Sequence, residues 1–267
     1  RHMEILGAQS GTVFLVHRDN ETLTDLVARL TSDTPGVDFV APDGVRHQIW
    51  QVVGADDISA LVHSFENNGP LYIADGHHRS AAASRVAKKR GIKEGGFLAV
   101  SFPVSEIAIL PYNRVVKDLN GHSAESLLKG ITEHFEVTQG KPEAIHKQNF
   151  AMYLQNKWYS LRAKDDSDRA QDPVRSLDVS ILQDFILDPL LAIDDPRTNK
   201  RVEFVGGIRG DEELVKRTDE AGGVAFSLSP TSIEELLRIA DADDVMPPKS
   251  TWFEPKLRDG LFVHLLD

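Results

Sequence analysis

The chain has 267 residues, of which 41% are hydrophobic and 27% charged, and its formal net charge is −11. This composition is typical of a globular protein and excludes a disordered chain. Its apolar runs have the length of strands and are too short to cross a membrane, so we expect no membrane association. The negative charge disfavours nucleic acid as a partner. Because the chain has no cysteine, disulfides, thiolate metal sites and a cysteine nucleophile are excluded. With no secretory signal visible, we expect a cytoplasmic protein.

Hydrophobic residues recur along the chain with two different periods, one typical of helices and one typical of strands. Residues 21–30 show the helical period most clearly, because four apolar side chains fall on one face. In chain order, the predicted elements are strand 12–17, helix 21–30, strand 45–53, helix 56–66, strand 71–74, helix 80–90, strands 97–102 and 107–110, helix 123–135, strands 150–154 and 157–161, helix 179–191, strand 202–205, helix 211–219, strand 224–228, helix 232–240 and strand 261–266.

The mixture of elements predicts an α/β (mixed α+β) fold with mixed sheets flanked by helices. Residues 164–173 are rich in aspartate and read as a linker or exposed loop. We therefore expect two lobes, residues 4–165 and 175–267. Thr231 and Glu234 have the spacing of a capping box at the start of helix 232–240.

The segment with the clearest chemistry is a polar turn between strand 71–74 and the following helix, which we expect to begin near Arg79 or Ser80. The first turn of a helix leaves N–H groups unpaired and attracts anions. Gly76 lets the backbone approach a ligand closely. His77 and His78 can donate hydrogen bonds or move protons near neutral pH. The pattern therefore predicts phosphate binding by Gly76, His78, Arg79 and Ser80.

The same turn carries candidate catalytic groups, namely Asp75, His77 and His78. Asp75 can act as a general base or hold Mg²⁺ beside a phosphate. Two other interpretations remain open from the residues alone. Asp75 can simply cap the helix while the histidines bond to water, or the two histidines can bind a metal, although no HxxxH or HExxH spacing accompanies them.

Three residues elsewhere are candidates for additional anion or substrate contacts: Arg114, Lys249 and Glu203. Lys249 follows two prolines that hold the chain extended, so its ammonium group can reach an anion or simply lie in solvent. Glu203 is a polar residue within a predicted strand and can face a site or the solvent.

Residues 72–79 (YIADGHHR) strongly resemble the signature of the family called domain of unknown function 1015. Further segments resemble the same family, so that the resemblance covers about residues 11–266: residues 43–50 (DGVRHQIW), 109–114 (ILPYNR), 177–179 (LDV) and 246–256 (MPPKSTWFEPK). Many relatives have Thr-His where this chain has Tyr112-Asn113. Members are typically longer at the N-terminus, so we expect this chain to be a fragment of a longer protein.

The DGHHR segment is also similar to the phosphate-holding motif of free serine kinases, which belong with ParB nucleotide-binding domains and sulfiredoxins. The resemblance implies a ParB/sulfiredoxin-like element around this turn, with Gly76, His77, His78 and Arg79 on phosphate and Asp75 beside the transferred group. It implies a phosphotransferase that uses ATP and Mg²⁺ on a small hydroxylated metabolite such as serine. The alternative is a non-catalytic nucleotide-binding regulatory module. The oligomeric state is left open.

Overall fold

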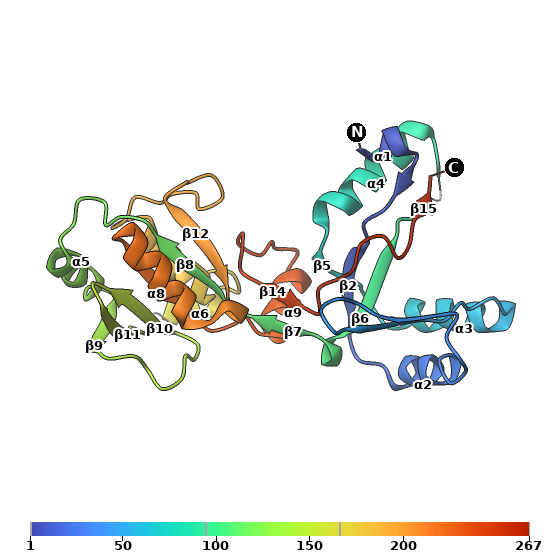
Figure 1. Cartoon of the computed structure of the whole chain (residues 1–267), viewed down its shortest axis with the longest axis horizontal. Coiled ribbons are helices and arrows are strands. Elements are labelled where there is room, and N and C mark those ends of the chain that lie inside the picture. The colour runs from blue at the N-terminus through green and yellow to red at the C-terminus, as the bar shows by residue number, and fades with distance from the viewer. Residues whose placement is uncertain (1, 94, 166, 267) are drawn as a thin grey trace. The chain divides into compact units, whose positions relative to one another are not determined.

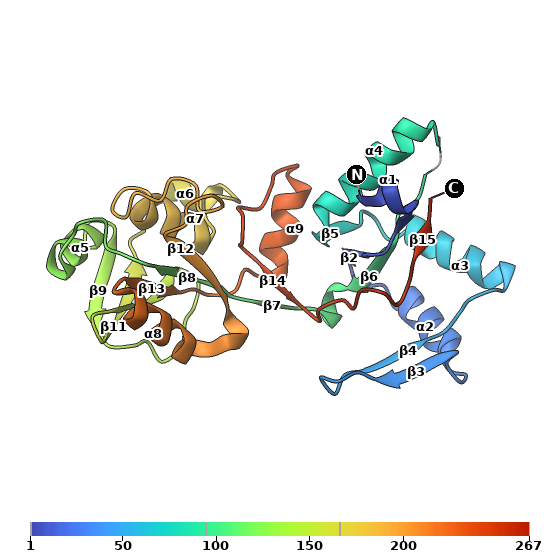
Figure 2. The same cartoon turned by 45° about the horizontal axis from the view of Figure 1, so that its top comes forward.

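The computed structural model describes residues 2–93, 95–165 and 167–266. Contacts between Cα atoms divide the chain into two compact units (Figures 1 and 2). Unit 1 consists of Arg1–Ile107 and Lys256–Asp267, and unit 2 of Ala108–Pro255. The predicted class, α/β with mixed sheets flanked by helices, is confirmed.

Unit 1 is built around a three-stranded sheet with the order β5-β2-β6, in which β2 pairs antiparallel with β5 and parallel with β6. The buried run Val13–His17 forms β2 because, as the central strand, it is covered on both sides. The unit's elements are α1 His2–Leu6, β1 Ala8–Gln9, β2 Val13–His17, α2 Glu21–Leu30, β3 Val37–Val40, β4 Arg46–Ile49, α3 Ala55–Glu66, β5 Tyr72–Asp75, α4 His77–Arg90, β6 Ala99–Pro103, η1 Val104–Glu106 and β15 His264–Leu265.

The helices of unit 1 follow from their local sequences. Asn20 caps α2 by accepting a hydrogen bond from the N–H of Leu23 at 3.1 Å. Gly91 ends α4 in the left-handed conformation with φ +71°. Both views show α1 lying alongside α4 (Figures 1 and 2), where Met3, Ala83 and Val86 form a small buried cluster.

Unit 2 contains a six-stranded antiparallel sheet with the order β12-β8-β13-β10-β11-β9. Its elements are β7 Ala108–Leu110, β8 Tyr112–Val116, α5 Ala124–Ile131, β9 Phe135–Gln139, β10 Asn149–Leu154, β11 Lys157–Ala163, α6 Ser167–Gln171, α7 Asp178–Leu182, η2 Gln183–Leu187, β12 Val202–Gly206, η3 Gly207–Arg209, α8 Gly210–Ala221, β13 Val224–Ser227, α9 Ile233–Asp241 and β14 Trp252–Glu254.

Successive side chains of a strand point to opposite faces of the sheet. In this sheet, each of the two faces packs against different helices. On one face, Val116, Met152 and Phe226 belong to the main core, which also contains buried residues of α5 and α7. On the other face, Val115 and Ala225 contact Leu214 of α8. Arg114 alternates with Val115 and therefore lies on the main-core face.

Several local expectations need correction. Residues 112–116 were not predicted as a strand, yet β8 lies in the interior of the sheet. The expected helix 179–191 is α7 followed by the π-helix Gln183–Leu187. The cap of α9 is Ser232 with Glu235, one residue later than the predicted capping box. The predicted loop 164–173 contains the short helix α6, because Arg169 is buried and its guanidinium bonds to the Arg175 carbonyl and the Asp184 carboxylate.

The boundary predicted between residues 165 and 175 falls inside unit 2. Strand β13, which follows this segment, pairs with β8 and β10, which precede it. An aspartate-rich segment is visible in the local composition and resembles a linker. Strand pairing across that segment is not visible in the local composition.

Candidate functional site

The predicted turn lies at the corner where β5 meets α4. Asp75 is the last residue of β5 and is paired with Phe14 of β2. Gly76 then reverses the chain with φ +96° and ψ 22°, a conformation that residues with a Cβ rarely adopt. A Cβ at this position would lie 3.2 Å from the Cα of Val13. Glycine is therefore required both by the turn and by the close approach of β2.

Helix α4 begins at His77, two or three residues earlier than predicted, so both histidines lie in its first turn and are exposed. The N–H groups of Arg79 and Ser80 already bond to the Gly76 carbonyl, at 2.8 and 3.0 Å. No side chain of the described residues caps this end of the helix, and the Asp75 carboxylate bonds to Arg79 instead, so Asp75 is not its cap. The N–H groups of His77 and His78 have no acceptor among the hydrogen bonds of the described residues. Such an end attracts anions.

Arg79 is held by the protein itself. Its guanidinium donates to the carboxylate of Asp75 at 2.7 Å and to the carbonyl of Thr12. It also fills the space beside two glycines, since a Cβ on Gly11 or Gly76 would come within 3.4 Å of its side chain. Arg79 therefore joins the turn before β2 to the β5–α4 corner. A phosphate bound by Arg79, as expected from the sequence, must therefore use the N–H groups that these two bonds leave available.

Asp75 remains largely accessible, with 68% of its side chain exposed despite the ion pair with Arg79. Among residues 2–93, 95–165 and 167–266, no group of three or more His, Cys, Asp or Glu side chains could hold a metal ion. Mg²⁺ is often bound by one or two carboxylates together with phosphate oxygens and water. One accessible carboxylate at an anion-attracting corner therefore fits Mg²⁺ only when a phosphate supplies further ligands.

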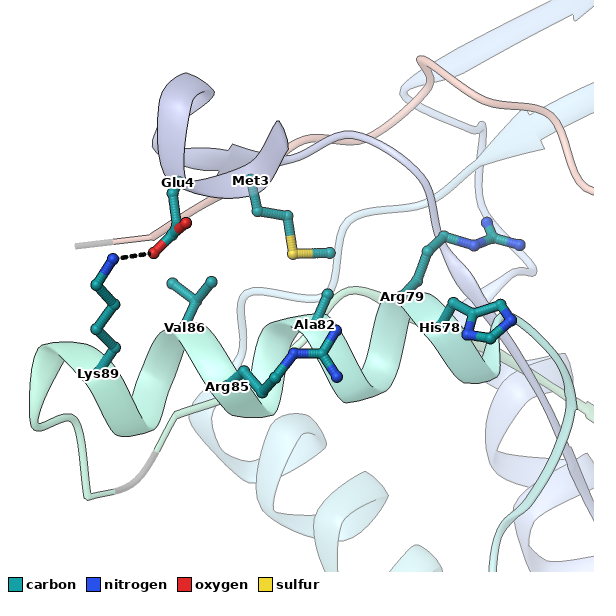
Figure 3. Close-up of a pocket in the computed structure, with 8 residues that line it drawn as sticks. All are labelled: Met3, Glu4, His78, Arg79, Ala82, Arg85, Val86 and Lys89. Atoms are coloured by element: carbon teal, nitrogen blue, oxygen red, sulfur yellow. Dashed lines mark hydrogen bonds and ion pairs between the residues drawn. The ribbon is translucent and has the colours of Figure 1, made fainter. Parts of the chain in front are cut away.

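A cavity of about 480 Å³ lies beside the corner, along one face of α4 (Figure 3). His78, Arg85 and Lys89 line it, together with the apolar side chains of Met3, Ala82 and Val86. Lys89 is paired with Glu4 of α1 at 2.6 Å. Figure 3 shows the guanidinium of Arg79 pointing away from Met3 and Val86, at the end of the helix where His78 lies. The cavity therefore joins an apolar strip to a row of basic groups.

The residues of this cavity beyond the turn itself were not predicted from the sequence. Residues 78, 82, 85, 86 and 89 recur at helical spacing, so a helix starting at His77 would place them on one face. This spacing predicts a shared helix face only when the start of the helix at His77 is known. Met3 and Glu4 gave no local signal, because they reach α4 through the tertiary structure.

The three additional candidates lie in unit 2, whereas the β5–α4 corner belongs to unit 1. Arg114 is buried in β8, and its guanidinium donates to the Tyr112 and Lys249 carbonyls. The Lys249 ammonium lies 5.6 Å from the centroid of the Tyr112 ring. Glu203 is paired with Lys117 at 2.8 Å and with Arg217 at 3.0 Å, and these cations lower the pKa of its carboxyl group.

Asn113, which stands where many relatives have histidine, is also structural here. Its side-chain carbonyl accepts the N–H of Leu228 at 3.1 Å, and the residue is buried.

The family model described as "Protein of unknown function (DUF1015)" matches residues 1–180. The chain belongs to the DUF1015 family. The motif YIADGHHR, on which the resemblance was based, lies within this match and forms the β5–α4 corner. No curated protein matches the sequence.

Several solved structures show a likeness to this DUF1015 protein. SbnI with a C-terminal truncation, from Staphylococcus aureus, is 13% identical with a TM-score of 0.46, and the match covers 98% of this chain and 88% of that one. A conserved hypothetical protein from Pyrococcus furiosus is 14% identical with a TM-score of 0.42, covering 94% of both chains. A free serine kinase in complex with AMP is 14% identical with a TM-score of 0.41, covering 92% and 89%.

Among the described residues of this chain, no helix has both the length and the apolar character needed to span a membrane.

Proposed function

We propose that the β5–α4 corner binds the phosphate groups of a nucleotide, and that this protein transfers a phosphoryl group from ATP or a similar donor to a small hydroxylated metabolite. The observation that carries the proposal is the uncapped start of α4, where Gly76 turns the chain and two exposed histidines follow. The neighbouring cavity of about 480 Å³ has a size common among small-molecule sites.

In this proposal, the N–H groups of the first turn, with Gly76, His78 and Ser80, hold the phosphate oxygens. Arg79 contributes its positive charge and keeps the corner in shape through Thr12 and Asp75. Phosphate can contact Arg79 through the guanidinium N–H groups that these two bonds leave available. Arg85 supplies further positive charge along the cavity, while Lys89 is paired with Glu4.

For the transfer step, the hydroxyl oxygen of the acceptor forms a bond to the terminal phosphorus as the bond to the leaving diphosphate breaks. Asp75 accepts the hydroxyl proton or holds Mg²⁺ together with phosphate oxygens, and His77 or His78 moves the proton to or from solvent. Mg²⁺ would neutralise charge on the phosphates. Arg114, Lys249 and Glu203 remain proposed as further anion or substrate contacts.

The ion pair between Asp75 and Arg79 favours a second candidate, a nucleotide-binding module without catalysis. One oxygen of the Asp75 carboxylate is engaged by the Arg79 guanidinium at 2.7 Å, so this carboxylate is a poorer metal ligand than one without such a partner. In such a module the corner would bind the nucleotide, and the protein would catalyse no reaction.

Calorimetric titration with ATP and ADP, each with and without Mg²⁺, tests phosphate binding, and α4 offers a matched pair of variants. Gly76→Ala and Gly91→Ala both place a Cβ on a positive-φ residue at an end of the same helix. Gly91→Ala should lower stability by about 1 kcal/mol, and Gly76→Ala should lower it by more, because its Cβ would also crowd Val13. Only Gly76→Ala should weaken nucleotide binding, by tenfold or more, because only there would the Cβ meet Val13 and Arg79. Absence of binding to the wild type, or equal loss in both variants, would overturn the proposal.

The same protein then separates the two candidates. If it is a phosphotransferase, ATP and an acceptor such as serine should be turned over by the wild type, whereas Asp75→Asn should bind nucleotide without turnover. Nucleotide binding by the wild type with no turnover of any hydroxylated acceptor would support the binding module instead.

A further inference from the structure

Arg114 is a cation buried in the sheet of unit 2, and none of the described residues gives it a negatively charged partner. It is 3% exposed, and its guanidinium donates to the carbonyl of Tyr112 and, at 3.1 Å, to that of Lys249. The guanidinium carbon lies 5.3 Å from the centroid of the Phe204 ring. All three contacts are uncharged, and no ion pair of the described residues includes Arg114.

Burial of an unpaired cation is energetically unfavourable, and it lowers the pKa of Arg114 to about 10. An anion brought against the guanidinium would offset this loss of hydration. A planar guanidinium with five N–H donors matches the two oxygens of a carboxylate especially well. Two of its nitrogens bond to backbone carbonyls, so donors remain for an incoming group.

A cavity of about 400 Å³ gives such an anion access to Arg114, and its lining is electrically asymmetric. It is formed by β8, α7, the turn around Asp194 and the loop at Pro247, all within unit 2. Two of its acids are already compensated, since Asp184 pairs with Arg169 and Asp195 with Arg197.

The third acid of the lining is Asp194. It is exposed, its carboxylate accepts only the N–H of Asp195 among the bonds of the described residues, and no ion pair there includes it. The cavity thus has an uncompensated cation at its buried end and an uncompensated carboxylate at its open end. The acidic end disfavours multiply charged anions such as phosphate or a nucleotide.

We infer that this cavity binds a small zwitterion, whose carboxylate meets Arg114 and whose ammonium group faces Asp194. A ligand with both charges compensates both ends of the cavity, whereas a simple carboxylate or a simple amine compensates one. The inference gives a chemical class to the group that Arg114, proposed above as an anion or substrate contact, would bind. It uses residues of unit 2 alone, so it can hold or fail separately from nucleotide binding by unit 1.

The test is ligand-observed NMR or calorimetry on the whole protein with zwitterions of increasing length, namely glycine, β-alanine and 4-aminobutyrate. Acetate and propylamine serve as probes that carry one of the two charges, and inorganic phosphate as a competing oxyanion. We expect at least one zwitterion to bind tenfold or more tightly than acetate, propylamine or phosphate.

Variants at the two ends identify the site. Asp194→Asn should reduce zwitterion affinity to the level of acetate without changing the melting temperature, because the residue is exposed. Asp188→Asn, which removes a charge from an exposed aspartate outside the cavity lining, should leave binding unchanged. Arg114→Gln should abolish binding of both zwitterion and acetate, and Arg114→Lys should retain part of it.

The inference is overturned if no zwitterion binds the wild type at millimolar concentration, or if phosphate or acetate binds as tightly as every zwitterion. Unchanged binding in Asp194→Asn would overturn it as well. This last outcome remains decisive even if Arg114→Gln fails to fold, because Asp194 makes no contact on which the core depends.

Discussion

Asp178, the first residue of α7, carries a carboxyl group that the fold buries. Its side chain accepts the N–H of Gln148 at 2.9 Å through one oxygen, while the other oxygen has no partner among the described residues. Burial, with a smaller contribution from Glu235, raises the pKa of Asp178 to about 7 against the opposing effects of the Gln148 N–H and Lys147. The proton is therefore held more tightly in the folded state than in the unfolded chain, where the pKa is near 3.8.

Between about pH 4 and pH 7, the folded protein keeps this proton while the unfolded chain releases it, so stability from this group falls as pH rises through that window. Asp178→Asn removes the titration and keeps the carbonyl that accepts the Gln148 N–H. Urea unfolding at pH 4.5, 5.5, 6.5 and 7.5 measures the free energy of unfolding of both proteins. From pH 4.5 to pH 7.5, this free energy should rise in the variant relative to the wild type by an amount of the order of 3 kcal/mol. A stability difference that stays constant across these pH values would contradict the prediction.

At the residue scale, the candidate site was readable from the sequence where its members are neighbours in the chain. Asp75 to Ser80 form one turn, so their types and order sufficed to single them out. The environment of Arg79 was not readable. Its partner Thr12 is 67 positions away and comes within reach only when β2 pairs with β5.

At the element scale, the pairing of β8 with β13 depends on a glycine at its edge. A Cβ on Gly223 would lie 1.8 Å from the carbonyl oxygen of Val116, which is far inside a normal contact. Gly223→Ala must therefore push two strands of the six-stranded sheet apart.

The neighbouring Gly222 provides the matched control, because it has φ +74° and open space where its Cβ would lie. Gly222→Ala should lower the free energy of unfolding by about 1 kcal/mol, as is usual at a helix C-terminus. Gly223→Ala should lower it by about 3 kcal/mol or prevent folding. Denaturant unfolding of both variants measures this, and equal losses would show that the strands accommodate the methyl group.

Strongly periodic or clearly punctuated elements were predicted well. The range of α2 agrees fully with the prediction, and the hairpin of β10 and β11 turns at Gln155 and Asn156, both with positive φ. Strand β8 (YNRVV) was missed because its sequence does not alternate between apolar and polar residues. Arg114 within it is in contact with segments distant in sequence, among them the Phe204 ring of β12 and the carbonyl of Lys249.

At the scale of the whole molecule, the two units differ in how the chain forms them. Unit 2 is one continuous segment, Ala108–Pro255, whereas unit 1 needs both ends of the chain. Strand β15 near the C-terminus pairs with β1 near the N-terminus, with Ala8 opposite Leu265. We therefore propose unit 2 as an independent folding unit.

A fragment of residues 108–255 should fold alone, with a cooperative thermal transition and circular dichroism typical of mixed helix and sheet. The fragment of residues 4–165 should not fold into a complete structure, because it lacks β12 and β13, which complete the six-stranded sheet. Folding of the 4–165 lobe, together with failure of 108–255, would support the boundary predicted from composition instead.

The sequence by itself determined the family, the α/β class and the polar turn from Asp75 to Ser80, because each depends on local order along the chain. Only the tertiary structure decided which groups surround that turn, that Arg79 is anchored by Thr12, and that Arg114 is a buried cation in a cavity of unit 2. The physical reason is that burial and charge compensation are set by distant segments brought together through strand pairing, and a local pattern carries no information about such partners.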